Sequence, residues 1–278
     1  MLSYQHGFHA GNFADVFKHC ALTHLIQYLI QKDKPLFYLE THSGRGLYDL
    51  SSHQSLKTNE FKEGIQLLWE QQKKCNAVFL PYLKLLKELN LNSALKYYPG
   101  SPYIALNLLR PTDRAHLCEL HPTEYEHLIH IPTTHKKVFF SPDDGPSSLN
   151  ALLPPIEKRG LIFIDPAYEV KEEYKTIPQA ISKAVSKFSN GVYCLWYPLV
   201  NQRMTEQMIR RLEQIPAKNT LRVEFYLKKQ KGQGMYGCGL WLINPPYTFA
   251  DTMTTVCKEL KLLFNSSESF YHIDKREQ

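Results

Sequence analysis

The sequence predicts an α/β fold built on a seven-stranded mixed sheet, and three observations lead to this prediction. Short apolar runs recur along the chain, and segments with helical periodicity separate most of them. Several of these runs end in an acidic residue or a glycine-containing turn, as parallel strands do where a sheet binds ligands. The last two runs are joined without a helix, which indicates one antiparallel strand.

Composition limits the class of protein. The chain has 278 residues, of which 43% are hydrophobic and 22% charged, and this fits one large globular domain or a domain with an insertion. Six cysteines without paired spacing indicate reduced, buried thiols in a cytoplasmic protein. No signal-peptide pattern and no apolar run of membrane-spanning length is found, so we expect no membrane partner. The net charge of +6 permits a polyanionic partner without requiring one.

Residues 1–30 predict a polar N-terminal stretch followed by a helix. Asn12 can cap this helix, and apolar residues recur at helical spacing from Phe13 onward. Lys18 and His19 then lie side by side in the second turn. Taken alone, this segment is typical of an amphipathic helix with exposed polar residues.

Residues 35–40 predict the first buried strand, which ends at Glu40. Gly44 and Gly46 follow in a turn, where glycine lets the backbone approach a ligand closely. Asp49 stands where a dinucleotide-binding fingerprint needs a third glycine, which argues against a nicotinamide-dependent oxidoreductase. A strand with an acidic end and a Gly-x-Gly turn is instead typical of the first motif of S-adenosylmethionine-dependent methyltransferases.

Residues 48–97 have a different pattern from the rest of the chain. Two segments with helical periodicity, 60–72 and 79–89, follow each other, and we expect no strand between them. Ser101 followed by Pro102 then predicts a helix start with a hydroxyl N-cap. We therefore predict a small helical subdomain at 48–97, inserted into a methyltransferase-like domain of residues 1–47 and 98–278.

The strand and helix alternation resumes after the insertion. Residues 115–119 predict a strand ending at Glu119, where a carboxylate can accept hydrogen bonds from ribose hydroxyls. Residues 137–140 predict the next strand, and Asp144 and Gly145 follow it, where an acidic side chain and a turn can bind an adenine amino group. The remaining predicted elements are strands at 161–164, 191–197, 221–227 and 239–243, helices at 177–188 and 204–212, and a loose charged tail from 274.

The strand at 161–164 leads into the candidate catalytic residues. Pro166 cannot donate to a sheet, so it ends the strand and leaves Asp165 at the carboxyl edge, with Tyr168 close behind. The sequence Asp165-Pro166-Ala167-Tyr168 resembles the Asp/Asn-Pro-Pro-Tyr/Phe motif of adenine-N6 methyltransferases, except that Ala167 replaces the second proline. In that motif the aromatic residue stacks on a flipped-out base.

A second segment, Asn244-Pro245-Pro246-Tyr247, matches the same motif without a departure. Its position argues against it, because it follows the predicted antiparallel strand and would lie at the opposite edge of the sheet. We therefore favour Asp165 as the catalytic residue over Asn244.

Several longer motifs occur together and in order. They are Met1-Leu2-Ser3-Tyr4-x-His6, His9-Ala10-Gly11-Asn12, Asp15-Val16-x-Lys18-His19, Thr41-His42-x-Gly44-x-Gly46, Tyr97-Tyr98-Pro99-Gly100-Ser101-Pro102, Glu119-Leu120-His121-Pro122, residues 159–168, and Trp196-Tyr197-Pro198. Through these motifs, nearly the whole chain resembles the bacterial 23S ribosomal RNA adenine-N6 methyltransferases of the large-subunit J type.

This resemblance implies a class I, Rossmann-like methyltransferase fold, S-adenosylmethionine as cofactor and a set of site residues. The implied catalytic residues are Asp165, Pro166 and Tyr168. The expected cofactor contacts are His19, His42, Gly44, Gly46, Ser101, Glu119, Asp144, Gly145 and Asp165. Tyr4, His6 and Lys18 are expected to form a wall or lid over the target adenine.

The resemblance also implies the partners. The expected substrate is 23S ribosomal RNA, free of protein or in an early assembly intermediate, and the expected enzyme is a cytoplasmic monomer without a metal. Lys18 is expected to meet a phosphate. The basic loop 228–231 either meets more distant RNA backbone or is a solvated turn.

Other functions remain open at this point. One is a DNA or small-molecule methyltransferase with the same site, and another is a nucleic-acid-binding protein with a decayed cofactor site. The chain lacks the Gly-x-Ser-x-Gly elbow of a Ser/His/Asp hydrolase. Its twelve histidines form no recognisable metal-binding pattern.

Overall fold

A central eight-stranded sheet organises the protein in the computed structural model, which describes residues 4–92, 94–230 and 234–277. The strand order across the sheet is β5-β4-β1-β6-β7-β9-β8-β10. The bounds are β1 Phe37–Glu40, β4 Arg114–Cys118, β5 Val138–Ser141, β6 Gly160–Ile164, β7 Val192–Leu199, β8 Asn219–Tyr226, β9 Gly237–Ile243 and β10 Phe270–Glu277. All seven predicted strands are present.

The direction of the strands also agrees with the sequence. β1 pairs in parallel with β4 and β6, and β6 pairs in parallel with β7, whereas β9 runs antiparallel to β7 and β8. The carboxyl ends of β1, β4, β6 and β7 therefore meet at one edge, as the prediction of a mixed sheet requires.

The sheet has one strand more than predicted, and the prediction of a loose tail is wrong, because β10 adds an eighth strand. It pairs antiparallel with β8 over its full length, from Phe270 opposite Tyr226 to Glu277 opposite Asn219. Arg276 also bridges to Glu213 at 2.8 Å. A charged edge strand discourages pairing with other chains, which explains why this strand lacks the apolar pattern of the others.

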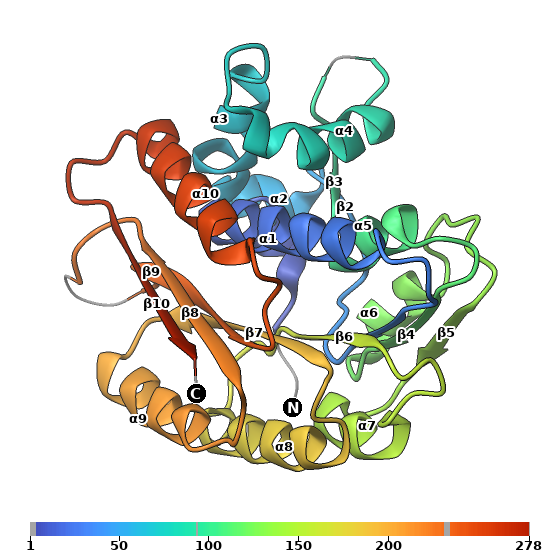
Figure 1. Cartoon of the computed structure of the whole chain (residues 1–278). Helices are drawn as coiled ribbons and strands as arrows, with labels where there is room; N and C mark the ends of the chain where they lie inside the picture. The colour runs from blue at the N-terminus through green and yellow to red at the C-terminus, as the bar shows by residue number, and fades with distance from the viewer. Residues whose placement is uncertain (1–3, 93, 231–233, 278) are drawn as a thin grey trace.

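Helices cover both faces of the sheet (Figure 1). On one face lie α1 Phe13–Leu29, α5 Ser101–Leu108 and α10 Phe249–Phe264, and on the other lie α7 Gly145–Leu152, α8 Glu173–Lys187 and α9 Gln202–Glu213. Helix α6 Pro122–Leu128 links β4 to β5, and the single turn η1 His6–Phe8 precedes α1. The apolar residues form two clusters, one on each face, so the sheet is buried between two layers of helices.

The segment between β1 and α5 packs over α1 and α10 (Figure 1). Its elements are β2 Leu47–Asp49, α2 His53–Thr58, η2 Glu60–Glu63, α3 Ile65–Glu70, η3 Ala77–Phe79, α4 Leu80–Leu89 and β3 Tyr97–Pro99. As expected, no strand lies between α3 and α4. The sequence did not predict the antiparallel pair of β2 and β3, which joins the two ends of the segment.

Two local predictions in this region need correction. The helix expected at 60–72 is broken at Gly64, where a Cβ would lie 2.1 Å from the carbonyl oxygen of Gly11. The N-cap of α5 is Gly100 rather than Ser101, and Ser101 is the first helical residue. Ser101 lines the cavity described below instead of capping the helix.

Two further observations concern the cysteines and the length of the apolar helices. All six cysteines are free, and five of them are buried. Among the helices of the described residues, none combines the length and apolar character that a membrane span requires.

Candidate active site

A cavity of about 550 Å³ opens at the carboxyl ends of β1, β4, β6 and β7. It is lined by almost every site residue that the sequence predicts. These are Tyr4, His6, Lys18, His19, His42, Gly44, Ser101, Glu119, Asp144, Gly145, Asp165, Pro166 and Tyr168. They come from segments far apart in the chain, and the parallel strands bring them together because their carboxyl ends share one edge.

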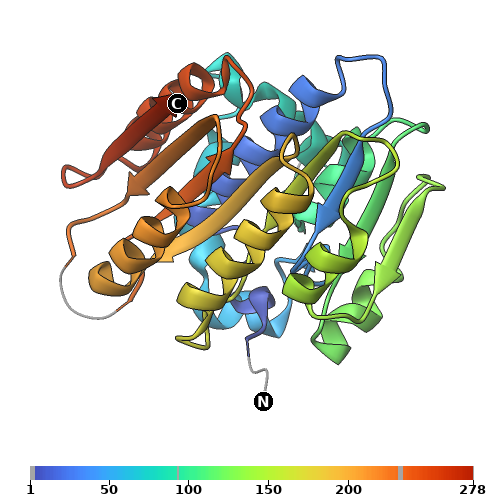
Figure 2. The same cartoon turned by 60° about the horizontal axis from the view of Figure 1, so that its bottom comes forward.

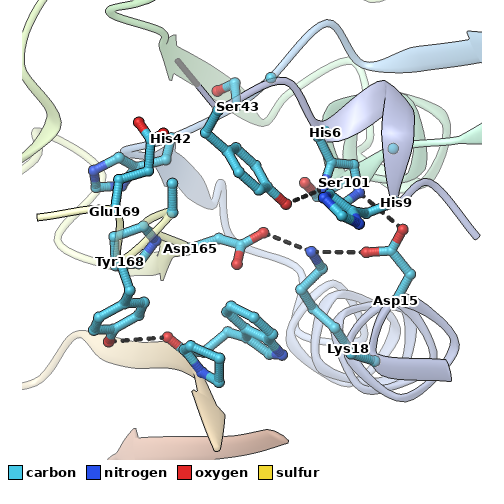
Figure 3. Close-up of a pocket in the computed structure, with 18 of the residues that line it drawn as sticks. His6, His9, Asp15, Lys18, His42, Ser43, Ser101, Asp165, Tyr168 and Glu169 are labelled. Carbon is cyan, nitrogen blue, oxygen red and sulfur yellow. Dashed lines mark hydrogen bonds and ion pairs between the residues drawn. The ribbon is translucent and has the colours of Figure 1, made fainter. Parts of the chain in front are cut away.

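A chain of hydrogen bonds and ion pairs crosses this cavity (Figure 3). Lys18 Nζ lies 2.7 Å from Asp165 Oδ2 and 3.0 Å from Asp15 Oδ1. Asp15 Oδ2 lies 2.9 Å from His6 Nε2, and His6 Nδ1 lies 2.8 Å from the Tyr4 hydroxyl. The N-terminal segment is thereby connected, through α1, to the carboxylate at the end of β6.

Lys18 is not an exposed residue, contrary to the prediction for an isolated amphipathic helix. It is 4% exposed and lies over the Trp196 ring, 5.2 Å from the centroid. Burial lowers the pKa of Lys18, but attraction to Asp15 and Asp165 outweighs this and raises the pKa above its usual value. The ammonium group is therefore charged and committed to two carboxylates, so the expected phosphate contact is not available in this arrangement.

Asp15 is the second carboxylate that contacts the Lys18 ammonium group. Burial raises the pKa of this carboxyl, but His6 and Lys18 lower it more strongly, and the pKa lies well below its usual range. The backbone N–H of Gly11 also donates to Asp15 Oδ2 at 2.8 Å. Asp15 is thus an anchor for both Lys18 and His6.

The segment after β6 has an unusual backbone at Tyr168. Its φ is +53°, in the left-handed region that side chains other than glycine rarely adopt. The Tyr168 hydroxyl donates to the Trp196 carbonyl oxygen at 3.3 Å, and the ring lies 4.6 Å from that of Tyr174. This sharp turn keeps Asp165 and Pro166 on the cavity wall.

The opposite part of the cavity has the features expected of a nucleoside site. Glu119 accepts hydrogen bonds from the backbone N–H groups of Gly44 and His121, each at 2.7 Å. Asp144 caps α7 by accepting from Ser147 N at 3.0 Å. Gly145 lies against β1 so closely that a Cβ would be 2.2 Å from the Thr41 carbonyl oxygen.

Two predicted cofactor residues are neutral histidines. Burial lowers the pKa of His19 to about 3 and that of His42 to about 4. His19 Nδ1 lies 2.7 Å from the Tyr98 hydroxyl, and His42 Nδ1 lies 2.8 Å from Thr41 Oγ1. Both rings can contact a ligand without adding a positive charge.

Glu40 lies at the end of β1, beneath this site. It is fully buried, and burial raises its pKa to about 8, although Ser101 and the Tyr38 hydroxyl act in the opposite direction. Tyr38 donates to Glu40 Oε2 at 2.9 Å.

One predicted cofactor residue, Gly46, and the rejected catalytic candidate, Asn244, lie outside the cavity lining. Gly46 does not belong to the cavity lining; its φ is +77°, and a Cβ there would lie 2.5 Å from Ile131 Cδ1. Gly46 therefore shapes the turn into β2. Asn244 follows the antiparallel β9, and its Nδ2 donates to the carbonyl oxygens of Ser189 and Gly191 at 2.8 Å, so it lies at the opposite edge of the sheet.

Sequence reasoning missed two residues that the site uses. Asp15 stands out in the sequence only as part of a motif, although its spacing from Lys18, three residues along a helix, is a signal for an ion pair. Trp196 is likewise part of a motif, and its cation–π contact with Lys18 depends on tertiary structure. Met1 to Ser3 of the first sequence motif and Lys231 of the predicted basic loop lie outside the residues that the structure describes.

No group of three or more His, Cys, Asp or Glu side chains that could hold a metal is found within the described ranges.

The strand order β5-β4-β1-β6-β7-β9-β8, with β9 antiparallel and the cavity at the carboxyl edge, defines a class I methyltransferase fold. The protein carries one further strand, β10, at the edge. The chain belongs to the family described as "Ribosomal RNA large subunit methyltransferase D, RlmJ", whose model matches residues 33–273.

Individual proteins agree with this family. The chain is 43% identical to a Haemophilus influenzae protein and 41% identical to an Escherichia coli K12 protein, both named Ribosomal RNA large subunit methyltransferase J. Each alignment covers 92% of this chain, together with 92% of the Haemophilus influenzae protein and 91% of the Escherichia coli protein. The chain is also 56% identical in sequence to protein LPL1258 from Legionella pneumophila, whose crystal structure is known. The two structures superpose with a TM-score of 0.92, and the match covers 96% of this chain and 98% of that one.

Proposed function

We propose that this protein transfers a methyl group from S-adenosylmethionine to N6 of an adenine in 23S ribosomal RNA. The names of the two relatives support methylation of large-subunit ribosomal RNA. The choice of adenine N6 rests on one observation: Asp165 and Pro166 lie together on the cavity wall, directly after β6.

The chain's residues fit the proposed cofactor. The close approach of Gly145 to Thr41 and the left-handed φ of +60° at Gly44 leave backbone, not side chains, beside the cavity. Glu119 and Asp144 supply carboxylate acceptors, and the neutral His19 and His42 supply rings without charge. We propose that these groups hold the nucleoside part, Glu119 at the ribose hydroxyls and Asp144 near the adenine amino group.

S-adenosylmethionine supplies an electrophilic methyl group on a sulfonium sulfur. The protein's task is to make the target amine a better nucleophile, because the N6 lone pair of adenine is delocalised into the ring. We propose that Asp165 and the Pro166 carbonyl oxygen accept the two amino hydrogens and so localise that lone pair. Alignment in the cavity supplies much of the rate, and the Asp165 carboxylate stabilises the positive charge that develops on nitrogen. The nitrogen loses a proton once the methyl group has left the sulfur.

The ion pair with Lys18 leaves one oxygen of Asp165 free to accept a hydrogen bond from the adenine amino group. The ammonium group engages Oδ2, and no described residue makes a hydrogen bond to Oδ1. We propose that Oδ1 meets the adenine, while Tyr4 and His6 line its approach. Tyr168 is proposed to support the bound base through its ring.

The remaining parts of the proposal follow from the resemblance and the family. We propose a methyltransferase domain of residues 1–47 and 98–278, with residues 48–97 as an inserted helical subdomain whose base is closed by the β2–β3 pair. We also propose a cytoplasmic monomer that acts on RNA free of protein or in an early assembly intermediate, without a metal.

The test is transfer of labelled methyl from S-adenosylmethionine to protein-free 23S ribosomal RNA, followed by nucleoside analysis. We expect N6-methyladenosine from the wild type and a loss of about 100- to 1,000-fold with Asp165→Asn. Asn244→Gly is the control, since glycine tolerates the φ of +54° at that position, and it should retain activity.

The other outcomes separate the alternatives. Methylation at another atom of the RNA would refute N6 specificity. Transfer to DNA or a small molecule, but not to RNA, would refute the RNA substrate. RNA binding without cofactor binding would identify a binding protein with a decayed site.

A further inference from the structure

A second pocket, of about 300 Å³, lies at the same edge of the sheet as the active site, between β8, α9 and β10. It is distinct from the site described above. Its lining is Leu199, Gln202, Thr205, Glu206, Arg222, Glu224, Tyr226, Lys228, Lys229, Gln230, Tyr236 and Phe270.

Only a thin wall separates the two cavities. Leu199 and Tyr236 line the second pocket, whereas their neighbours Val200 and Met235 line the first. The Tyr236 N–H donates to the Leu199 carbonyl oxygen at 3.0 Å, so the wall is one hydrogen-bonded pair of chain segments. A polymer that places one unit in the active site can therefore reach the second pocket with a nearby unit.

The pocket contains polar atoms that the protein does not use. Thr205 is 2% exposed, and its Oγ1 has no hydrogen-bond partner among the described residues. Arg222 Nε is likewise buried and has no hydrogen-bond partner among the residues that the structure describes. Both residues line the pocket, and buried polar groups are normally satisfied. Each residue therefore has one hydrogen-bonding atom left for a ligand that displaces the side chains covering it.

Arg222 is held in place by a buried carboxylate that accepts hydrogen bonds from three side chains. Glu224, 1% exposed, accepts from Arg222 Nη2 at 2.8 Å, the Tyr197 hydroxyl at 2.9 Å and the Tyr226 hydroxyl at 2.7 Å. Residues 222, 224 and 226 lie on one face of β8, because strand side chains alternate. The guanidinium is therefore fixed in orientation, with Nε left to donate.

The remaining groups match a nucleotide. Phe270 is 43% exposed and stacks on Tyr226, with centroids 4.1 Å apart and planes 8° from parallel. This pair offers an aromatic surface of the kind on which unstacked bases rest. Lys228 and Lys229 are exposed beside it and can meet phosphates, while Glu206 is the one other carboxylate in the described lining besides Glu224.

We propose that this pocket binds a nucleotide of the substrate RNA close to the target adenine in the same strand. The base lies against Phe270, Thr205 Oγ1 and Arg222 Nε donate to the nucleotide, and the two lysines contact its phosphates. This inference rests on the proposed function, since it assumes an RNA substrate, and it adds a second site of recognition to it.

The sharpest test uses Thr205→Val, which removes the hydroxyl but keeps the shape. The hydroxyl has no bond within the described structure, so the melting temperature should be unchanged or higher. The dissociation constant for a 23S ribosomal RNA transcript, measured by fluorescence anisotropy, should rise about threefold to tenfold. Thr254→Val on α10 is the matched control and should leave the dissociation constant for RNA unchanged.

Two further variants test the aromatic and the basic parts. Phe270→Ala should weaken RNA binding, whereas Phe139→Ala, an exposed phenylalanine on the far edge strand β5, should not. Replacing both Lys228 and Lys229 with Gln should reduce the slope of log affinity against log salt by about 0.7 for each phosphate that is no longer neutralised. In methyl transfer, all three should raise KM with kcat retained.

The outcomes separate this inference from the proposed function. Unchanged RNA affinity and salt slope in Thr205→Val, Phe270→Ala and the double lysine variant would overturn the second site, whatever the activity. A wild type that binds RNA but transfers no methyl group would overturn the proposed function, and the affinities would still decide the pocket. A wild type that does not bind RNA would overturn both.

Discussion

Asp15 and Asp165 lie on either side of a single ammonium group, that of Lys18, at 3.0 and 2.7 Å. One carboxylate belongs to the first helix and the other to the end of the fourth parallel strand. Because all three groups are largely buried, this bridge couples the position of the N-terminal segment to that of the proposed catalytic carboxylate.

Lys18→Met tests this bridge. Removing one partner of a buried ion pair leaves uncompensated charge, so we expect the free energy of unfolding to fall by about 3–5 kcal/mol. Chemical denaturation measures it. Combining Lys18→Met with Asp165→Asn should cost less than the sum of the single changes, and strict additivity would show that the two residues do not interact.

Glu40→Gln tests the buried carboxyl beneath the cofactor site. Its folded pKa of about 8 lies above the unfolded value, so the folded state binds a proton more tightly. Its contribution to stability is full below the unfolded pKa of about 4.5 and is lost as pH rises toward 8, at up to about 1.4 kcal/mol per unit.

The measurement for Glu40 is the difference in unfolding free energy between Glu40→Gln and wild type, taken from pH 5 to pH 8. It should shift in favour of the variant as pH rises. A difference independent of pH would mean that Glu40 titrates normally in the folded protein.

Gly145→Ala tests the contact between α7 and β1. A Cβ would lie 2.2 Å from the Thr41 carbonyl oxygen, so the start of α7 must move away from the strand. We expect a loss of about 1–3 kcal/mol in stability and weaker binding of S-adenosylmethionine, measured by calorimetry. Ala151→Ser, exposed on the same helix, is the control. Wild-type cofactor affinity in Gly145→Ala would show that this contact does not shape the site.

Ala167→Pro tests the departure from the adenine-methyltransferase motif. Within the described chain, the Ala167 N–H donates no backbone hydrogen bond, so proline removes none. We expect methyl transfer within about threefold of the wild type, because Asp165 and the Pro166 carbonyl keep their places. A large loss would mean that residue 167 needs a φ that proline cannot adopt.

Much of the fold could be predicted because its strands are marked by local sequence. The apolar run at 161–164, closed by Pro166, became β6 with a shift of one residue at its start. The site followed from the same reasoning, since side chains after parallel strands must converge. The rejection of Asn244 required only the direction of one strand, and β9 has that direction.

The features that were missed depend on contacts distant in sequence. Lys18 and Asp165 are 147 positions apart, and nothing local shows that the lysine is buried. β10 has polar side chains and is fixed by its partner β8 rather than by an apolar pattern. The break at Gly64 arises because the backbone of Gly11 passes next to it.

The direction of β10 has a practical consequence for anyone who modifies the protein. Tyr4 lines the active-site cavity, whereas Glu277 pairs with Asn219 at the opposite edge of the sheet (Figure 2). A purification tag or fluorescent label joined ahead of Tyr4 would begin beside the cavity wall and would compete with incoming RNA. One joined after Glu277 would begin far from it, so immobilisation through that end should leave substrate access open.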